Sequence, residues 1–187
     1  MTSRNKLDQW SYLAERGLAD TFECSWVETP DYRAVVTKLR VEEETLACDL
    51  NQARRWYQPY AEEIVVWVGE QSPGWVTMFT VSGLFPWPAI DSLLRPGGRV
   101  YHLSYYADEV SEPVYFDGSE WAEDISADHW DRPRQEGAGL TGSSDLAREM
   151  NFYLAALAYR TGGFIDDTWF TTPGLLCRIP DGAWPRA

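Results

Sequence analysis

The sequence has few of the residues that disulfide frameworks and metal centres require. Only three cysteines, Cys24, Cys48 and Cys177, are scattered through its 187 residues. Neither their number nor their spacing matches a set of disulfides or the paired cysteines of a zinc site. Two histidines and no D-x-[DN]-x-[DN]-G loop leave no recognisable ligand set for zinc or calcium. We therefore expect three reduced cysteines, no metal and no cofactor.

Positive charge is also scarce. The chain has 16 Lys and Arg against 29 Asp and Glu, which gives a formal net charge of -13. Such a surface repels nucleic acid and attracts basic proteins. The basic residues Arg54 and Arg55 lie beside Trp56 and Tyr57, but this group is too small for a nucleic-acid footprint. We expect a basic protein partner and no nucleic acid.

Long hydrophobic runs are missing as well. Apolar runs such as 64–68 are far shorter than the roughly 20 residues of a membrane-spanning helix. The first ten residues lack the apolar core of a secretory signal. We expect no membrane insertion and a cytoplasmic protein, and the sequence leaves the oligomeric state open.

What the sequence does contain is enough apolar surface for one folded domain over 1–187, since 44% of its residues are hydrophobic and 14% aromatic. Period-two alternation and turn residues predict strands at 21–27, 63–69, 75–81 and 99–106, with Pro73-Gly74 in a hairpin loop between the second and the third. They also predict a hairpin of 113–116 with 119–125 about a tight Asp117-Gly118 turn. In the first strand, Phe22, Cys24 and Trp26 should share one face.

Helical periodicity appears near both ends of the chain and in two segments between them. It predicts helices at 5–16, from Thr29 as cap through Leu39, around 46–56, at 89–94 and at 143–160, with a loop at 126–142. The last helix has Ser143 or Ser144 as its cap and Gly162-Gly163 as its end. It should bury Leu146, Met150, Tyr153, Leu154 and Leu157. Hairpins in mid-chain with helices at the N- and C-terminal ends predict an α+β fold with a mostly antiparallel central sheet.

Three segments resemble an uncharacterised domain family common in actinobacteria. They are 22–28 running into 29–35, 98–106 running into 115–118, and the predicted helix 143–160 followed by 164–170. The family has no assigned activity, so the resemblance implies no catalytic residues. This chain departs from the family in its long acidic loop and in Trp87, which has proline on both sides. Bacterial immunity proteins and antitoxins are often small acidic α+β domains of similar build, an analogy at the level of fold.

The most informative feature is residues 108–131, here called the acidic strip. It holds nine acidic residues, no Lys or Arg, and several aromatic rings. Charges of this kind steer a partner, while Trp and Tyr anchor it. We interpret the chain as a non-enzymatic immunity protein or antitoxin that binds a basic protein through the strip. The predicted contact residues are Glu120, Trp121, Asp124, Asp128 and Trp130.

Three patterns suggest chemistry without specifying it. On a strand, Glu120 and Asp124 would lie about 13 Å apart, beyond the roughly 5–9.5 Å of glycosidase carboxyl pairs. His102 shares a strand face with Ser104, but no nucleophile elbow or orienting acid accompanies them. The G-x-G-x-x-G at 137–142 precedes a helix without the strand that a dinucleotide site requires, which leaves phosphate binding there open.

An alternative function is a small-molecule binding or hydrolytic domain with an aromatic-lined pocket. Its predicted lining residues are Trp75, Trp87, His102, Tyr105 and Tyr106. A third class, a scaffold or oligomeric domain, would need only an apolar patch for self-association. Catalysis is the less favoured reading, because no arrangement in the sequence dictates a reaction.

Overall fold

The computed structural model describes residues 5–41, 45–83, 85–93, 98–106, 109–111, 113–116, 121–122, 128–180 and 182–183. The strands are β1 (Thr21–Glu28), β2 (Thr45–Asp49), β3 (Ile64–Ser72), β4 (Trp75–Ser82), β5 (Val100–Tyr106), β6 (Glu109–Val110), β7 (Val114–Phe116), β8 (Trp121–Ala122) and β9 (Pro173–Ile179). The α-helices are α1 (Gln9–Glu15), α2 (Tyr32–Lys38), α3 (Leu50–Ala53), α4 (Trp87–Leu93), α5 (Asp128–Gln135), α6 (Asp145–Thr161) and α7 (Asp167–Thr171). Two 3₁₀ turns are η1 (Arg54–Trp56) and η2 (Ala138–Leu140).

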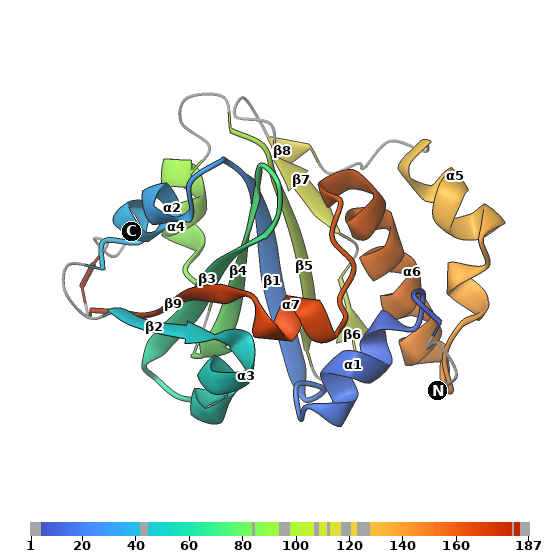
Figure 1. Cartoon of the computed structure of the whole chain (residues 1–187), viewed down its shortest axis with the longest axis horizontal. Coiled ribbons are helices and arrows are strands. Elements are labelled where there is room, and N and C mark those ends of the chain that lie inside the picture. Colours follow the sequence, from blue (N-terminus) through green and yellow to red (C-terminus); the bar gives the residue numbers. More distant parts are fainter. Residues whose placement is uncertain are drawn as a thin grey trace.

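The strands form one sheet with helices on both sides (Figure 1). Its order is β2-β9-β3-β4-β1-β5-β7-β8, with β6 also beside β5, and the pairs between these described strands are antiparallel. The predicted α+β fold with an antiparallel central sheet is confirmed.

The larger hydrophobic core lies between the sheet and helices α1, α6 and α7. Phe22, Cys24 and Trp26 of β1 all point into it, as the alternation predicted. From α6, Met150 and Leu154 pack into the same core, and Leu146 packs against its border. Ser144 caps α6 by accepting a hydrogen bond from the Ala147 amide at 3.1 Å, as one of the two predicted cap residues.

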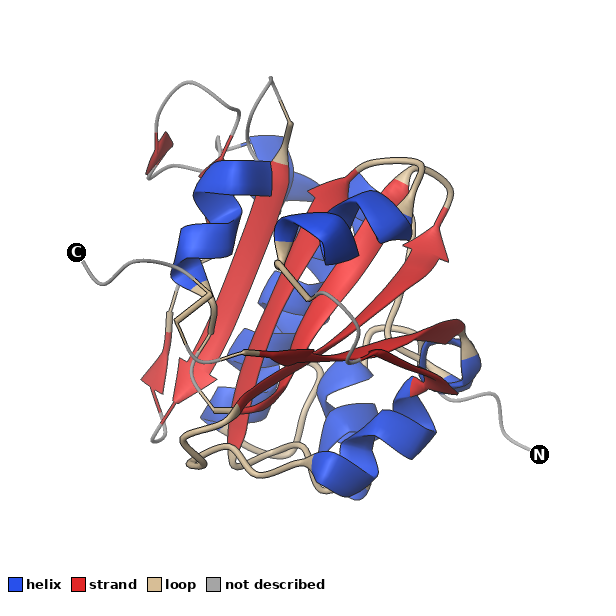
Figure 2. Cartoon of the chain, turned by 90° about the vertical axis from the view of Figure 1, so that its left-hand side faces the viewer, coloured by secondary structure: helices blue, strands red, loops and turns tan. Residues whose placement is uncertain are grey.

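The opposite face of the sheet is only partly covered. Val35, Val36 and Leu39, from α2 and the residue that follows it, pack with Ala89 of α4 over the valines of β3 and β4. Figure 2 shows these two helices in front of the upper part of the sheet. The ends of β1 and β5 at Thr21 and Tyr106 lie away from them, so the polar residues there remain accessible.

The predicted helix around 46–56 is wrong in its first half. Residues 45–49 form β2, and its Leu46 side chain is 53% exposed. The helix begins only at Leu50, because Asp49 and Gln52 form a reciprocal capping box with bonds of 2.7 and 3.2 Å. Similarly, Asp31 caps α2 through the Arg33 amide, in place of the predicted Thr29.

The predicted loop at 126–142 contains α5 and η2. Trp130 of α5 stacks on Phe152 of α6 with ring centroids 5.3 Å apart, and this packing offsets the cost of Pro133 inside the helix. The predicted hairpin about Asp117-Gly118 corresponds to β7 paired with β8, where Phe116 lies opposite Trp121. The turn residues 117–120 lie outside the described part of the chain.

The C-terminal segment adds α7 and β9, which the sequence patterns did not predict. Strand β9 lies inside the sheet, between β2 and β3. A Cβ on Gly174 would lie 2.6 Å from the Trp67 ring, so only glycine fits where β9 crosses it.

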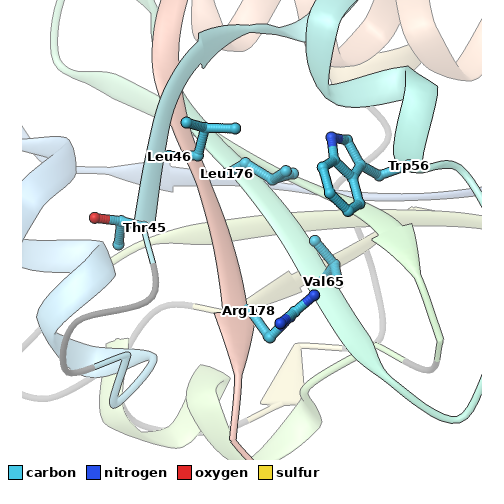
Figure 3. A pocket seen from close by; sticks show the side chains of 6 residues that line it. All are labelled: Thr45, Leu46, Trp56, Val65, Leu176 and Arg178. Atoms are coloured by element: carbon cyan, nitrogen blue, oxygen red, sulfur yellow. The ribbon is translucent and has the colours of Figure 1, made fainter.

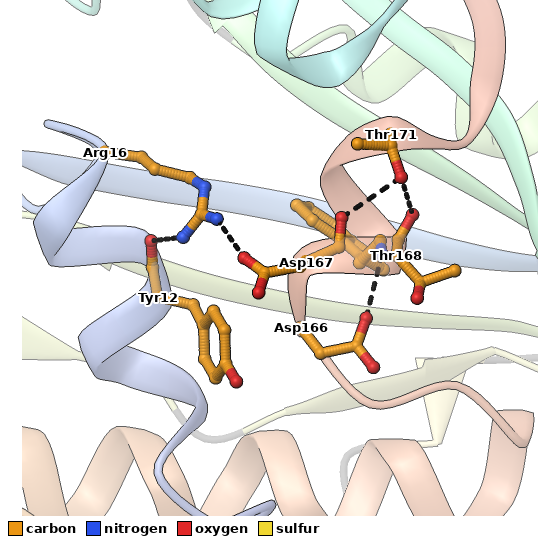
Figure 4. Close-up of polar contacts among 7 residues, drawn as sticks. Tyr12, Arg16, Asp166, Asp167, Thr168 and Thr171 are labelled. Carbon is orange, nitrogen blue, oxygen red and sulfur yellow. Dashed lines mark hydrogen bonds and ion pairs between the residues drawn. The ribbon is translucent and has the colours of Figure 1, made fainter. Parts of the chain in front are cut away.

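Helix α7 is held against α1 by a polar cluster (Figure 4). Asp166 caps α7 by accepting from the Trp169 amide at 3.0 Å. The Arg16 guanidinium pairs with Asp167, donates to the Tyr12 carbonyl at 3.1 Å and lies 4.2 Å from the Phe170 ring centroid. The segment 164–170 therefore has a structural role, because its contacts attach the last part of the chain to helix α1.

Candidate functional site

A cleft of about 280 Å³ opens at the uncovered end of the sheet. Its lining residues are Thr21, Glu23, Pro59, Thr80, Gly83, Ser104, Tyr105 and Tyr106. The pairing of β1 with β5 sets Glu23 opposite Ser104 and Ser25 opposite His102. Because alternate residues of a strand share a face, these polar side chains form a row beside the cleft.

The Glu23 carboxyl is the main electrostatic feature of this cleft. Its side chain is 25% exposed, and burial raises its pKa to about 7, partly opposed by a hydrogen bond from the Phe85 backbone. Among the described residues, no Lys or Arg forms an ion pair with the Glu23 carboxylate. The imidazole nitrogen Nε2 of His102 lies 4.0 Å from its Oε1. Glu23 therefore exchanges its proton near neutral pH and has no cation within the described structure to compensate its charge.

His102 lies deeper, next to Glu23. Its Nδ1 is hydrogen-bonded to the Ser25 hydroxyl at 2.9 Å. The rings of Phe85 and Trp87 lie 4.6 and 4.7 Å from the imidazole, centroid to centroid. Burial lowers its pKa to about 3, so the ring is neutral at physiological pH and is a weak base there.

Two buried polar atoms at the cleft have no hydrogen-bond partner among the described residues. They are Nε2 of His102, on the side of the ring that faces Glu23, and Oγ1 of Thr80, which lines the cleft. A buried polar group left unpaired costs about 1–3 kcal/mol. Such groups are normally satisfied by water or by a ligand, which makes this cleft the strongest candidate for a binding site.

Aromatic rings surround the entrance. Tyr60 and Tyr106 are 67% and 60% exposed, and their ring centroids lie 6.1 Å apart in an edge-to-face arrangement. The Tyr57 hydroxyl donates to the Thr21 carbonyl at 2.8 Å and fixes the segment that carries Tyr60. Exposed tyrosines held in place in this way resemble the anchors of protein interfaces.

The site can bind more readily than it can catalyse. Ser25, His102 and Glu23 follow one another as in a hydrolase triad, but Ser25 is completely buried. The 4.0 Å between His102 and Glu23 exceeds a hydrogen bond. A buried hydroxyl cannot reach a substrate carbonyl, so this arrangement does not supply a nucleophile.

The sequence prediction paired His102 with Ser104, whereas its hydrogen-bond partner is Ser25 on β1. Glu23 and Ser25 were missed as site residues. The sequence pattern that could have identified them is the row of polar residues at alternate positions 21, 23 and 25. These residues face away from the apolar residues of the same strand.

Of the five residues of the predicted aromatic pocket, Tyr105 and Tyr106 line the cleft, and Trp75, Trp87 and His102 are not among its described lining residues. Trp75 packs on Tyr101 on the larger-core side, with ring centroids 5.5 Å apart, and Tyr105 packs on Trp10 in that core. Trp87 and His102 lie together on the opposite face, and Tyr106 stands at the cleft entrance. Strand alternation places the ring of Tyr105 in the core and that of Tyr106 at the cleft entrance, although both residues border the cleft.

Two of the five predicted contact residues of the acidic strip lie outside the described structure. This applies to Glu120 and Asp124, while Trp121 and Asp128 are placed only as the first residues of β8 and α5. Trp130 is half-buried and packs on Phe152 and Tyr153, so part of its ring area stabilises α5.

The G-x-G-x-x-G at 137–142 follows helix α5 and contains η2, so it is not preceded by the strand of a dinucleotide-binding unit. A Cβ on Gly142 would lie 2.8 Å from Ala147, which gives this glycine a packing role at the start of α6.

A second cavity of about 250 Å³ lies beside β2 (Figure 3). Its lining residues are Thr45, Leu46, Trp56, Val65, Leu176 and Arg178. Leu46 and Trp56 are largely exposed, and Arg178 is paired with Glu63 at 2.6 Å. The cation of this cavity is already compensated, and none of its described lining residues carries a buried polar atom without a partner, so it is a weaker candidate for selective binding than the cleft at Glu23.

No family model, no curated protein and no solved structure matches this chain. Within the described ranges, no group of three or more His, Cys, Asp or Glu is arranged to hold a metal ion, and the three cysteines are free. None of the described helices has the length and apolarity needed to cross a membrane.

Proposed function

We propose that this protein is a non-enzymatic, cytoplasmic binding protein that covers a basic protein partner, as an immunity protein or antitoxin does. The observation that carries the proposal is the Glu23 carboxyl, which is largely buried in an open cleft without a Lys or Arg partner among the described residues. In a chain of net charge -13, a partner is the natural source of the missing cation.

Further acids adjoin the cleft. Asp20 precedes Thr21 and is exposed, and Glu109 of β6 pairs with Tyr106 at the cleft entrance. Since Glu109 belongs to the acidic strip, the cleft and the start of the strip are neighbours on one side of the protein. Charges distributed in this way accelerate the approach of a basic surface.

The aromatic residues of the same region would supply affinity. Tyr60 and Tyr106 are exposed next to a largely buried acid, which combines the rigid rings and the desolvated charge that dominate interface energetics. In this proposal Glu120, Asp124 and Asp128 act on the association rate, and the tyrosines on the dissociation rate.

A second candidate is the binding of a small polar molecule in the same cleft. It is favoured by the unpaired His102 Nε2 and Thr80 Oγ1, which a ligand of a few atoms could satisfy. The hydrolytic form of this alternative is disfavoured by the burial of Ser25.

The test is affinity capture from native lysate at low and high salt, followed by binding kinetics with the captured protein. Changing Glu120, Asp124 and Asp128 together to Gln or Asn should slow association about tenfold or more at low ionic strength and flatten its salt dependence. A control that changes the exposed acids Glu15, Glu70 and Glu149 should have a smaller effect. Capture of no basic protein, or unchanged rates in the strip variant, would count against the proposal.

A further inference from the structure

The polar groups around the cleft are mainly hydrogen-bond acceptors. Glu23 contributes carboxylate oxygens when ionised, Ser104 and Thr80 contribute hydroxyl oxygens, and no basic residue is among the lining residues. Thr80 Oγ1 and His102 Nε2 are more than nine-tenths buried and have no hydrogen-bond partner in the described ranges, and they lie in and beside this space. Such a site fits a ligand group with several donors and a positive charge.

We infer that the cleft receives one guanidinium group, an arginine side chain of the basic partner, which pairs with Glu23 and is flanked by Tyr60 and Tyr106. This inference rests on the proposed function, because it identifies the partner group that the cleft recognises. The occupant is one side chain, and the remainder of the partner would contact the acidic surface around it.

A guanidinium fits better than the other ligand classes. It has five donors in a plane and no acceptor, so it can bond a carboxylate with two N–H groups and still donate to Thr80. Its flat face also packs on aromatic rings, which the exposed Tyr60 and Tyr106 provide. An ammonium has three donors and no plane, and an anion such as phosphate would be repelled by Glu23 and the neighbouring Glu109 and Asp20.

Binding of the cation should be coupled to the protonation of Glu23. The titratable groups that line the cleft or lie against Glu23 are His102, Tyr105 and Tyr106, and His102 is kept neutral by burial. A guanidinium would therefore bind more tightly at pH 8 than at pH 6, because at the lower pH it must displace a proton from the carboxyl.

The experiment is an NMR titration of the isotope-labelled full chain with N-acetyl-L-arginine amide. We expect saturable shifts of backbone amides at the cleft residues Thr21, Glu23, Thr80 and Tyr106, with a Kd of about 1–10 mM for so small a probe. The uncharged isostere N-acetyl-L-citrulline amide should bind at least about tenfold more weakly, and N-acetyl-L-lysine amide should be weaker than the arginine probe.

Two variants locate the site. Glu23→Gln should weaken the arginine probe about tenfold or more and remove its pH dependence, whereas Glu70→Gln, an exposed acid on β3 that does not line the cleft, should leave both unchanged. Tyr106→Ala is a second variant, and its amide spectrum shows directly whether it is folded. Equal binding of citrulline and arginine, shifts that are unaffected by Glu23→Gln, or binding of inorganic phosphate in the cleft would overturn the inference.

The outcomes separate this inference from the proposed function. If the arginine probe binds as expected and no basic protein is captured, the guanidinium site stands and the partner proposal fails. If a basic protein binds Glu23→Gln with wild-type rates while the strip variant slows association, the partner proposal stands and the guanidinium inference is refuted.

Discussion

Replacing Glu23 by glutamine should stabilise the fold at pH 8, although it removes the main polar group of the proposed site. In the native protein the carboxyl is three-quarters buried, has no Lys or Arg ion pair in the described part of the chain, and has its pKa raised from 4.5 to about 7. The folded state therefore favours the protonated acid. Glutamine has nearly the same shape and carries no charge to desolvate.

The sign and size of the effect follow from proton linkage. Since the folded pKa lies above the unfolded one, the contribution of Glu23 to stability is complete below pH 4.5 and is lost as the pH rises through about 7. A shift from 4.5 to about 7 corresponds to about 3 kcal/mol at 1.36 kcal/mol per unit, an upper value because part of the side chain reaches solvent. We expect a gain of about 2–3 kcal/mol at pH 8 and of about 1 kcal/mol or less at pH 5.

Urea denaturation followed by tryptophan fluorescence at the two pH values measures this difference. Glu70→Gln, at an exposed position, provides the matched control and should change stability by less than about 0.5 kcal/mol at either pH. A gain below about 0.5 kcal/mol at pH 8, or the same gain at both pH values, would refute the idea of a buried carboxylate without a counter-charge. A stabilising change that weakens binding is the expected mark of a functional residue.

Three further predictions concern the fold. Leu154→Ala removes a buried side chain of α6 and should lower the free energy of unfolding by about 2–5 kcal/mol in chemical denaturation. The control Leu140→Ala, at an exposed residue, should lower it by less than about 0.5 kcal/mol, and equal effects would contradict the described core. Asp166→Ala removes the N-cap of α7 and should cost about 0.5–2 kcal/mol, and no loss of stability would show that the cap is dispensable. Thiol titration in denaturant without reductant should find all three cysteines free, and elemental analysis should find no zinc; a mass two daltons low would reveal a disulfide.

The sequence by itself determined the elements whose signals are local. Alternation placed β1 and β5 close to their observed bounds, and Pro73-Gly74 between two apolar runs predicted the β3–β4 hairpin. The period of α6, with Ser144 as cap and Gly162 as stop, predicted both its limits and its buried side. In these elements, propensity, pattern and turn chemistry agree, so little was left for the tertiary structure to decide.

Pairing between distant segments determined the remaining elements. Both described partners of strand β9, β2 and β3, lie more than 100 residues earlier in the chain, so its position between them depends on long-range contacts. Residues 45–49 carry Leu46 at a spacing that suits a helix, but pairing with β9 draws them into the sheet. Helix α5 forms despite Pro133 because Trp130 finds a stacking partner on α6.

The candidate site depends almost entirely on tertiary structure. Ser25 and His102 are 77 residues apart in the chain, and they meet because the register of β1 against β5 sets them opposite each other. A shift of one residue in that register would send one of them to the other face. Helices α2 and α4 then cover only part of this face, and that limited coverage leaves Glu23 in a cleft. Composition indicated an acidic binding protein, but the burial that raises the Glu23 pKa exists only in the folded chain.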